Sequence, residues 1–222
     1  MLEIALANGV EPRCIVFFGA HCDDIEIGCG GTIQQLTKQL PRTQFVFVTL
    51  SSNEPRAAES RTAAKLLLAD AANQAVEIKQ FKDGYFPFVG ADIKPYFEDV
   101  KARYQPDVIF AHRKDAHQDH CVVNSLTWNT FRDHLIFEYE VVQYDGELAS
   151  PNVFVSLTRG QLDQKIAVLT QSFTSQLDRQ WFTPDTFAAL ARLRGVECNA
   201  PGGFAEAFYC RKLRLNLSAP IP

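Results

Sequence analysis

Residues 14–32 read CIVFFGAHCDDIEIGCGGT, a hydrophobic run followed by a polar turn and a glycine-rich segment. The first seven residues, 14–20, are mostly β-branched or aromatic, which is typical of a buried strand. His21, Asp23 and Asp24 come next, so an imidazole and two carboxylates stand directly after the run. This stretch therefore predicts a strand that delivers polar side chains to one edge of a sheet.

Hydrophobic runs and helical patterns alternate along the rest of the chain. We expect further strands over residues 45–50, 76–81, 107–112, 139–145 and 153–157. We expect helices over residues 31–39, 54–70, 91–104 and 159–180, and a return to loop and strand over 195–215. The alternation predicts an α/β fold, a Rossmann-like three-layer sandwich with a mostly parallel sheet. We see no repeat or domain boundary, so we expect a single domain over residues 1–222.

The composition is that of an ordinary globular protein, with 46% hydrophobic and 22% charged residues among 222. The net charge is −4 without a basic block, which argues against a nucleic-acid partner. The sequence has neither an apolar run near the ~20 residues of a membrane span nor a signal-peptide pattern. Six cysteines without a Cys-x-x-Cys pair indicate reduced thiols, and we expect a cytoplasmic protein.

Polar motifs also follow the next three expected strands. They are SSNEPR at residues 51–56, KDGYF at 82–86 and HRKDAHQDH at 112–120. In open α/β sheets, ligands bind beyond the carboxyl ends of the strands. We therefore expect these motifs and the first turn to form one functional site.

Histidines gather in two of these loops, and only His134 of the five lies elsewhere. His21 with Asp24, and His117 with His120, are each three residues apart, so both members of a pair can face one point. Neutral imidazole and carboxylate oxygen are zinc ligands, and a catalytic zinc takes about three protein ligands and a water. We expect one Zn²⁺ per chain, and Fe²⁺ or Co²⁺ fits the same ligands.

Asp23 lies beside a predicted ligand in the sequence, so its carboxylate can take a proton from a metal-bound water. The glycines at 28, 30 and 31 are expected to let the chain pass close to the site and enter a helix. They match neither the Walker pattern nor G-x-G-x-x-G, so we do not interpret them as a nucleotide loop.

Each motif also has a structural interpretation that involves no chemistry. The first motif alone is typical of a solvated loop with Asp24 capping a helix, and the second of a helix start with Asp119 as N-cap. His112 is either a supporting contact or the end of a strand, and Cys22 is either a bystander thiol or an extra soft ligand. The occurrence of both motifs at matching strand ends favours the metal interpretation.

The sequence resembles the LmbE/PIG-L family of zinc-dependent deacetylases of N-acetylglucosamine conjugates. The resemblance is carried by AHCDDIEIGCGGT (20–32), PRAAESRTAAKLLLAD (55–70), HRKDAHQDH (112–120) and GGFAEAF (202–208). It covers the chain from about residue 14 to 215, and the first and third of these motifs are specific in combination. It implies an LmbE-like fold and an enzyme.

The resemblance implies a role for each residue of the two histidine motifs. His21, Asp24 and His120 would bind the zinc. Asp23 would be the general base. His117 would stabilise the oxyanion or protonate the leaving amine.

The resemblance also implies supporting roles and shows two departures. Asp119 would orient a histidine, Arg56 would contact the sugar, and Asp83 would bind a hydroxyl group. Without the resemblance, Arg56 is equally typical of a helix-surface charge and Asp83 of a turn. Cys22 replaces the family's usual proline, and Ile25 stands where many members have glutamate.

The implied function is a zinc-dependent hydrolase that removes the N-acetyl group from an N-acetylglucosamine-type amino sugar or its conjugate, releasing acetate and a free amine. Residues 159–222 would form a C-terminal segment that shapes the substrate pocket. One alternative is an amidase of a thiol-sugar conjugate, and another is a non-catalytic, metal-stabilised sugar-binding module. We expect a small-molecule substrate, and the 17 phenylalanines leave scope for an apolar interface in a homo-oligomer.

Overall fold

The computed structural model describes residues 3–6, 10–144, 146 and 148–215, and its core is one seven-stranded sheet. The strands are β1 (Cys14–Gly19), β2 (Gln44–Thr49), β3 (Asn73–Ile78), β4 (Val108–His112), β5 (Leu135–Tyr139), β6 (Val153–Leu157) and β7 (Phe204–Tyr209). The helices are α1 (Asp24–Gln39), α2 (Glu54–Leu67), α3 (Phe86–Tyr104), α4 (Gln118–Thr130), α5 (Arg159–Ser172) and α6 (Pro184–Glu197), with a 3₁₀ turn η1 (Thr174–Gln176). No helix within these described ranges is long and apolar enough to cross a membrane.

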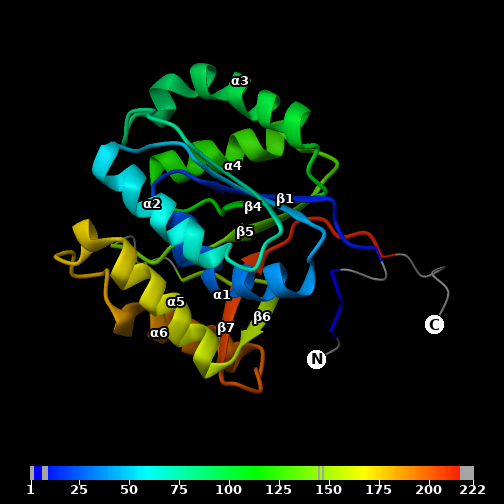
Figure 1. The fold of residues 1–222 in the computed structure, drawn as a ribbon, viewed down its shortest axis with the longest axis vertical. Helices are drawn as coiled ribbons and strands as arrows, with labels where there is room; N and C mark the ends of the chain where they lie inside the picture. Colours follow the sequence, from blue (N-terminus) through cyan, green and yellow to red (C-terminus); the bar gives the residue numbers. More distant parts are fainter. Residues whose placement is uncertain (1–2, 7–9, 145, 147, 216–222) are drawn as a thin grey trace.

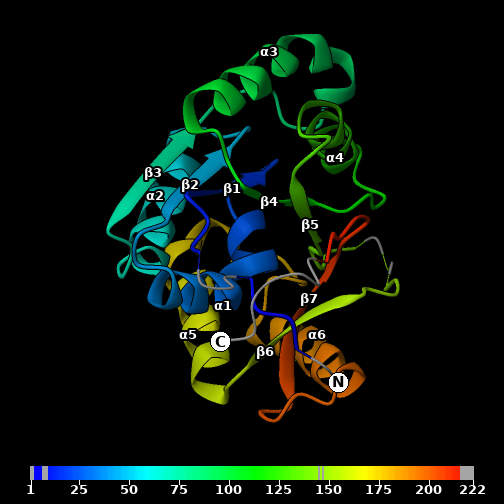
Figure 2. The ribbon, with the colours of Figure 1, turned by 90° about the vertical axis from the view of Figure 1, so that its right-hand side faces the viewer.

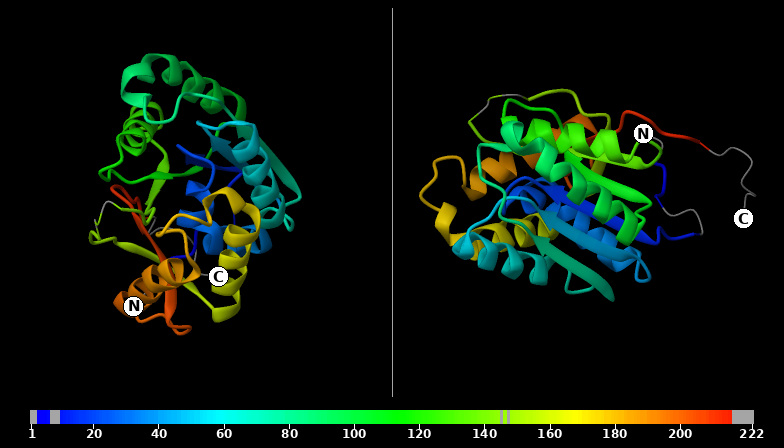
Figure 3. Two further views of the ribbon diagram at one scale, coloured as in Figure 1. Left: turned by 90° about the vertical axis from the view of Figure 1, so that its left-hand side faces the viewer. Right: turned by 90° about the horizontal axis from the view of Figure 1, so that it is seen from above.

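Helices cover both faces of the sheet, as the three-layer prediction requires. Figure 1 shows α3 and α4 on one side and α1, α2, α5 and α6 on the other, and Figure 3 shows the same layers from above. Two hydrophobic cores fill the spaces between the layers because neighbouring strand residues point to opposite faces. Phe17 packs under α1 and α2, whereas Phe18 packs under α3 and stacks on Phe97 at 4.4 Å.

The strand order is β3-β2-β1-β4-β5-β7-β6, and the first five strands in it run parallel. The order reverses between β1 and β4, which are hydrogen-bonded neighbours. α1 follows β1 and α4 follows β4, so both helices begin at this reversal. A reversal of strand order is where α/β sheets bind their ligands.

The C-terminal part of the chain extends the same sheet. β7 runs antiparallel between β5 and β6, and α6 packs against β7 (Figure 2). α5 packs against both α1 and α2. The C-terminal segment is therefore in contact with the helix that carries the first histidine motif.

Three expectations for secondary structure are corrected. The strand expected over 139–145 is β5 at Leu135–Tyr139, because β4 ends at His112 and offers no partner to the residues after Tyr139. Residue 145 lies outside the described residues. The strand expected over 76–81 lies at 73–78, and α6 falls in a region where we expected no helix.

Candidate metal and active site

Asp24 is the first residue of α1, and its carboxylate is fully buried among three histidines. Its Oδ2 accepts a hydrogen bond from the backbone N–H of His21 at 2.6 Å and lies 3.4 Å from the Nδ1 of the same residue. Its Oδ2 also lies 3.0 Å from His112 Nε2, and its Oδ1 lies 3.6 Å from His120 Nε2. Burial opposes ionisation, but the histidines outweigh it and hold the pKa of Asp24 well below its ordinary value.

Asp24 Oδ1 and His120 Nε2 are both buried without a hydrogen-bond partner among the described residues. They face each other at a separation too long for a hydrogen bond. Buried polar atoms are rarely left unbonded because desolvation without a partner costs about 1–3 kcal/mol. A carboxylate oxygen and an imidazole nitrogen that face each other without a hydrogen bond are donors that fit a metal ion.

The surrounding donors complete a set of the right chemistry. Ligand atoms of His21, His117 and His120 lie within 4.8 Å of one another, as do those of Asp24, His112 and His120. Both groups share His120 and consist of nitrogen and oxygen donors, which zinc accepts. The structure thus brings together all four residues of the two predicted pairs.

Asp115 is a site residue that sequence reasoning missed. Its Oδ2 lies 2.8 Å from His120 Nδ1, so the Nδ1–H donates to the carboxylate and Nε2 keeps a free lone pair. Asp115 lies five residues before His120 in the HRKDAHQDH motif (112–120). No known spacing of metal ligands distinguishes it from the other polar residues of that motif. It fixes the tautomer in which His120 can bind a metal.

His112 belongs to the group around Asp24 rather than merely ending β4. Its ring stacks on that of His120 at 3.8 Å, and Tyr139 Oη lies 3.1 Å from its Nε2. Burial and the neighbouring His120 lower the pKa of His112 to about 4. The imidazole is therefore neutral at physiological pH, and its Nε2 accepts a hydrogen bond from the backbone N–H of Ala20 at 3.0 Å.

Asp23 occupies the N-cap position of α1 but makes no capping hydrogen bond. Its Oδ1 forms an ion pair with Arg56 at 2.9 Å. Burial raises the pKa of Asp23 above its ordinary value although Arg56 opposes the shift. Arg56 lies inward, with its side chain 16% exposed, and it also contacts Glu59 at 3.1 Å, so it is not a surface charge.

α4 begins at Gln118 with His117, not Asp119, as its N-cap. The motif therefore both begins a helix and supplies histidines to the site, so the two interpretations of it do not exclude each other. Asp119 accepts hydrogen bonds from the backbone N–H groups of Gly84 and Phe86 at 2.6 and 3.1 Å, and its Oδ2 lies 3.3 Å from His21 Nε2. Asp119 therefore contacts His21 and joins the loop before α3 to the site.

Asp83 lies in a turn and also reaches the site. Its Oδ1 is 3.1 Å from His21 Nε2, and its side chain is 74% exposed. Gly84 follows with a φ of 77°, a conformation that favours glycine. The hydrogen bond to His21 lowers the pKa of Asp83, so a charged carboxylate stands at the solvent side of the histidines.

The two departures from the family pattern lie away from the metal donors. Cys22 donates from Sγ to the backbone carbonyl of Ser51 at 3.4 Å, and burial raises its pKa to about 12. Its Sγ is turned to this carbonyl and belongs to none of the possible metal-binding groups among the described residues, which favours the bystander interpretation. Ile25 is 1% exposed in the hydrophobic core, where a carboxylate would lack partners.

Comparison with known proteins gives one family and a shared fold. The family model "PIG-L: GlcNAc-PI de-N-acetylase" matches residues 16–131. N,N'-diacetylchitobiose deacetylase from Pyrococcus horikoshii is 18% identical, with a TM-score of 0.69 over 90% of this chain and 84% of that one. The 4-carboxy-2-hydroxymuconate hydratase GalB from Pseudomonas putida KT2440 is 18% identical, with a TM-score of 0.71 over 92% and 98%.

The zinc-inhibited form of teicoplanin deacetylase Orf2 is 11% identical, with a TM-score of 0.67 over 89% of this chain and 97% of that one. These structures share the LmbE-type fold with this chain and catalyse different reactions. The reaction must therefore be argued from the side chains and the family, since the fold is common to deacetylases and a hydratase.

Proposed function

Because this chain belongs to the PIG-L family, we propose that it is a metal-dependent N-deacetylase of an N-acetylglucosamine-type amino sugar or its conjugate. The products would be acetate and a free amine. The observation that carries the proposal is the buried, unbonded pair of atoms Asp24 Oδ1 and His120 Nε2. Structural neighbours that are named as deacetylases support the same reaction class.

We assign the metal to His21, Asp24 and His120, with zinc as the expected ion and Fe²⁺ or Co²⁺ as alternatives. When bound, the ion would polarise the acetyl carbonyl and lower the pKa of a water molecule. Asp115 would hold His120 in the required tautomer, and Asp119 would hold His21.

Asp23 is the proposed general base. Arg56 holds its carboxylate through Oδ1 at 2.9 Å, and the other oxygen would accept the proton of the attacking water. A base works best when its pKa approaches the working pH, and burial shifts the pKa of Asp23 in that direction. The ion pair with Arg56 limits the rotation of the carboxylate.

His117 is the proposed donor to the oxyanion or to the leaving amine. Its Nδ1 accepts a hydrogen bond from the backbone N–H of Asp119 at 3.3 Å, so in the neutral ring the proton stands on Nε2. Burial and the neighbouring His120 lower the pKa of His117, which keeps the ring neutral. A neutral ring can donate from Nε2 to a developing negative charge.

Arg56 and Asp83 are the proposed substrate contacts, and residues 159–222 the proposed pocket-shaping segment. Ser175 of η1 lies 3.3 Å from the Arg56 guanidinium, which brings this segment to the edge of the site. Tyr85 and Phe88, next to Asp83, are 46% and 80% exposed and give the conjugated part of a substrate apolar contact area. Residues 216–222 lie outside the described part of the chain.

The test combines metal analysis with a substrate panel. We expect about one zinc per chain, and acetate release from N-acetylated amino sugars that stops on chelation and returns with added zinc. The panel should include N-acetylglucosamine, a glycosylated form, a nucleotide-linked form and a thiol-sugar conjugate. Bound zinc without acetate release from any of them, in a chain that hydrates a 2-hydroxymuconate instead, would contradict the deacetylase.

A further inference from the structure

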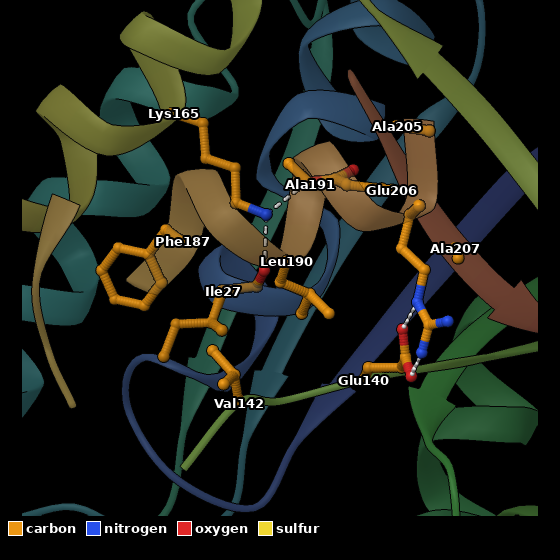
Figure 4. Close-up of a pocket in the computed structure, with 12 residues that line it drawn as sticks. Ile27, Glu140, Val142, Lys165, Phe187, Leu190, Ala191, Ala205, Glu206 and Ala207 are labelled. Carbon is orange, nitrogen blue, oxygen red and sulfur yellow. Dashed lines mark hydrogen bonds and ion pairs between the residues drawn. The ribbon is translucent and has the colours of Figure 1, made fainter. Parts of the chain in front are cut away.

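A buried ion pair from the C-terminal segment contacts the backbone of α1. Lys165 on α5 and Glu206 on β7 meet at 2.6 Å between Nζ and Oε1, and their side chains are 7% and 4% exposed. Figure 4 shows both side chains at the edge of a small cavity beneath α1. Neither residue takes part in the proposed chemistry.

The remaining hydrogen-bonding capacity of the pair is used on α1. Glu206 accepts from the backbone N–H of Gly31 at 2.8 Å with Oε1 and from that of Thr32 at 2.6 Å with Oε2. Lys165 donates from Nζ to the backbone carbonyl of Ile27 at 2.6 Å. The pair therefore binds the backbone of α1 at Ile27 and, about one turn later, at Gly31 and Thr32.

The glycine-rich sequence of α1 is explained by the close approach of other elements. A Cβ at Gly28 would lie 2.2 Å from the Tyr139 ring, and one at Gly30 would lie 3.0 Å from Lys165 Cγ. These glycines lie inside the helix rather than before it, which corrects the expectation from the sequence. Gly28 therefore admits the Tyr139 ring of β5, and Gly30 admits Lys165 of the C-terminal segment.

The held backbone is bonded directly to the turn that carries the proposed catalytic carboxylates. The Ile27 N–H donates to the Asp23 carbonyl at 2.9 Å, while Lys165 bonds to the carbonyl of the same Ile27. A displacement of Ile27 would therefore move the peptide between Asp23 and Asp24. Side chains that are misplaced by about 1 Å can lose much of their effect on a reaction.

We propose that Lys165 and Glu206 are positioning residues that set the direction of the Asp23 and Asp24 carboxylates by holding α1. Both lie outside residues 16–131, the part matched by the family model. The inference rests on the proposed function for the identity of the metal site. The hold on α1 can be measured without metal or substrate.

The chain offers a matched control in a second buried ion pair. Arg194 and Glu140 line the same cavity, meet at 2.6 Å, and have side chains that are 3% and 7% exposed. Figure 4 labels Glu140. Arg194 directs its other bonds to Glu197 and to the Ala149 carbonyl. E140Q therefore perturbs a comparable pair that bonds elsewhere than α1.

The experiment compares E206Q with E140Q. We expect both to lower the melting temperature, because each weakens a buried charge pair. Only E206Q should speed amide hydrogen exchange at Gly31 and Thr32 in the metal-free protein and weaken zinc binding about tenfold or more in a zinc titration. Equal exchange and equal zinc affinity in the two folded variants would overturn the proposal.

G30A is the second variant if E206Q does not fold. It replaces a helical glycine with a better helix former, so the chain should fold, while its Cβ, 3.0 Å from Lys165 Cγ, would push that side chain by a few tenths of an ångström. We expect weaker zinc binding in G30A, and parental affinity there would equally overturn the proposal. A parent chain that binds no zinc contradicts the proposed function itself, while exchange at Gly31 still reports the hold on α1.

Discussion

Two buried polar clusters contact α1, one around Asp24 and His120 and the other formed by Lys165 and Glu206. They differ in how completely their polar atoms are hydrogen-bonded. At the first residue of the helix, Asp24 Oδ1 and His120 Nε2 have no hydrogen-bond partner within the described part of the chain. About two turns later, Glu206 binds two backbone N–H groups and a lysine, so both of its oxygens are used. The fully bonded cluster supports architecture, whereas the incomplete one indicates a place for a ligand.

The largest expected effect comes from changing the incomplete cluster. D24N removes the negative charge that faces three histidines. Loss of a residue that only supports a ligand weakens metal binding by up to about 100-fold, and we expect zinc affinity to fall further in D24N. Acetate release should disappear with the metal. Metal analysis after dialysis gives the answer, and a D24N protein that keeps its zinc would remove Asp24 from the ligand set.

A change at the neighbouring carboxylate should separate binding from chemistry. We expect D23N to keep its zinc and to lose about 10²- to 10⁴-fold in kcat, because the water loses its proton acceptor. Steady-state kinetics on metal-loaded protein measure this. Full activity in the loaded variant would show that another group accepts the proton.

Asp115 tests the contact behind a ligand. D115N should weaken zinc binding about 10- to 100-fold, because an amide can present its N–H to His120 Nδ1 and allow the wrong tautomer. The comparison variant is D107N, whose carboxylate pairs with Arg13 at 3.2 Å at the start of β1. Similar zinc affinities in the two variants would leave Asp115 with a structural role alone.

The smallest effect is expected in a fully bonded cluster far from the site. Glu77 on β3 accepts hydrogen bonds from Arg103, Tyr96 and Tyr104 of α3, which lower its pKa from 4.5 to about 2. Its contribution to stability is therefore present above about pH 4.5 and is lost as the pH falls toward about 2.

E77Q should lower the free energy of unfolding at pH 7 by about 1 kcal/mol, since the partly exposed carboxylate is screened by solvent. It should also flatten the pH dependence of stability below pH 4.5 and leave zinc affinity unchanged. Chemical denaturation across this pH range measures the first two effects. A loss of zinc binding in E77Q would show that the cluster around Glu77 affects the metal site as well as stability.

The sequence predicted the fold class and the place of the site because both follow from local patterns. The run at 14–20 matched β1, and the rule that ligands bind at strand ends brought His21 and His120 to one point. Asp115 was not predictable, because its role depends on how the loop after β4 folds back on His120. The burial of Glu206 likewise depends on an antiparallel strand that joins the sheet from the far end of the chain.

The bond between Lys165 and Ile27 joins residues 138 positions apart, and that between Glu206 and Thr32 joins residues 174 apart. If the first motif were transferred into another protein, it would therefore need partners equivalent to Lys165 and Glu206. A gene fragment ending after α4 would encode every proposed metal donor and still lack the support of the helix that carries Asp24. The proposed site residues, which lie between His21 and His120, therefore depend on residues from the last third of the chain.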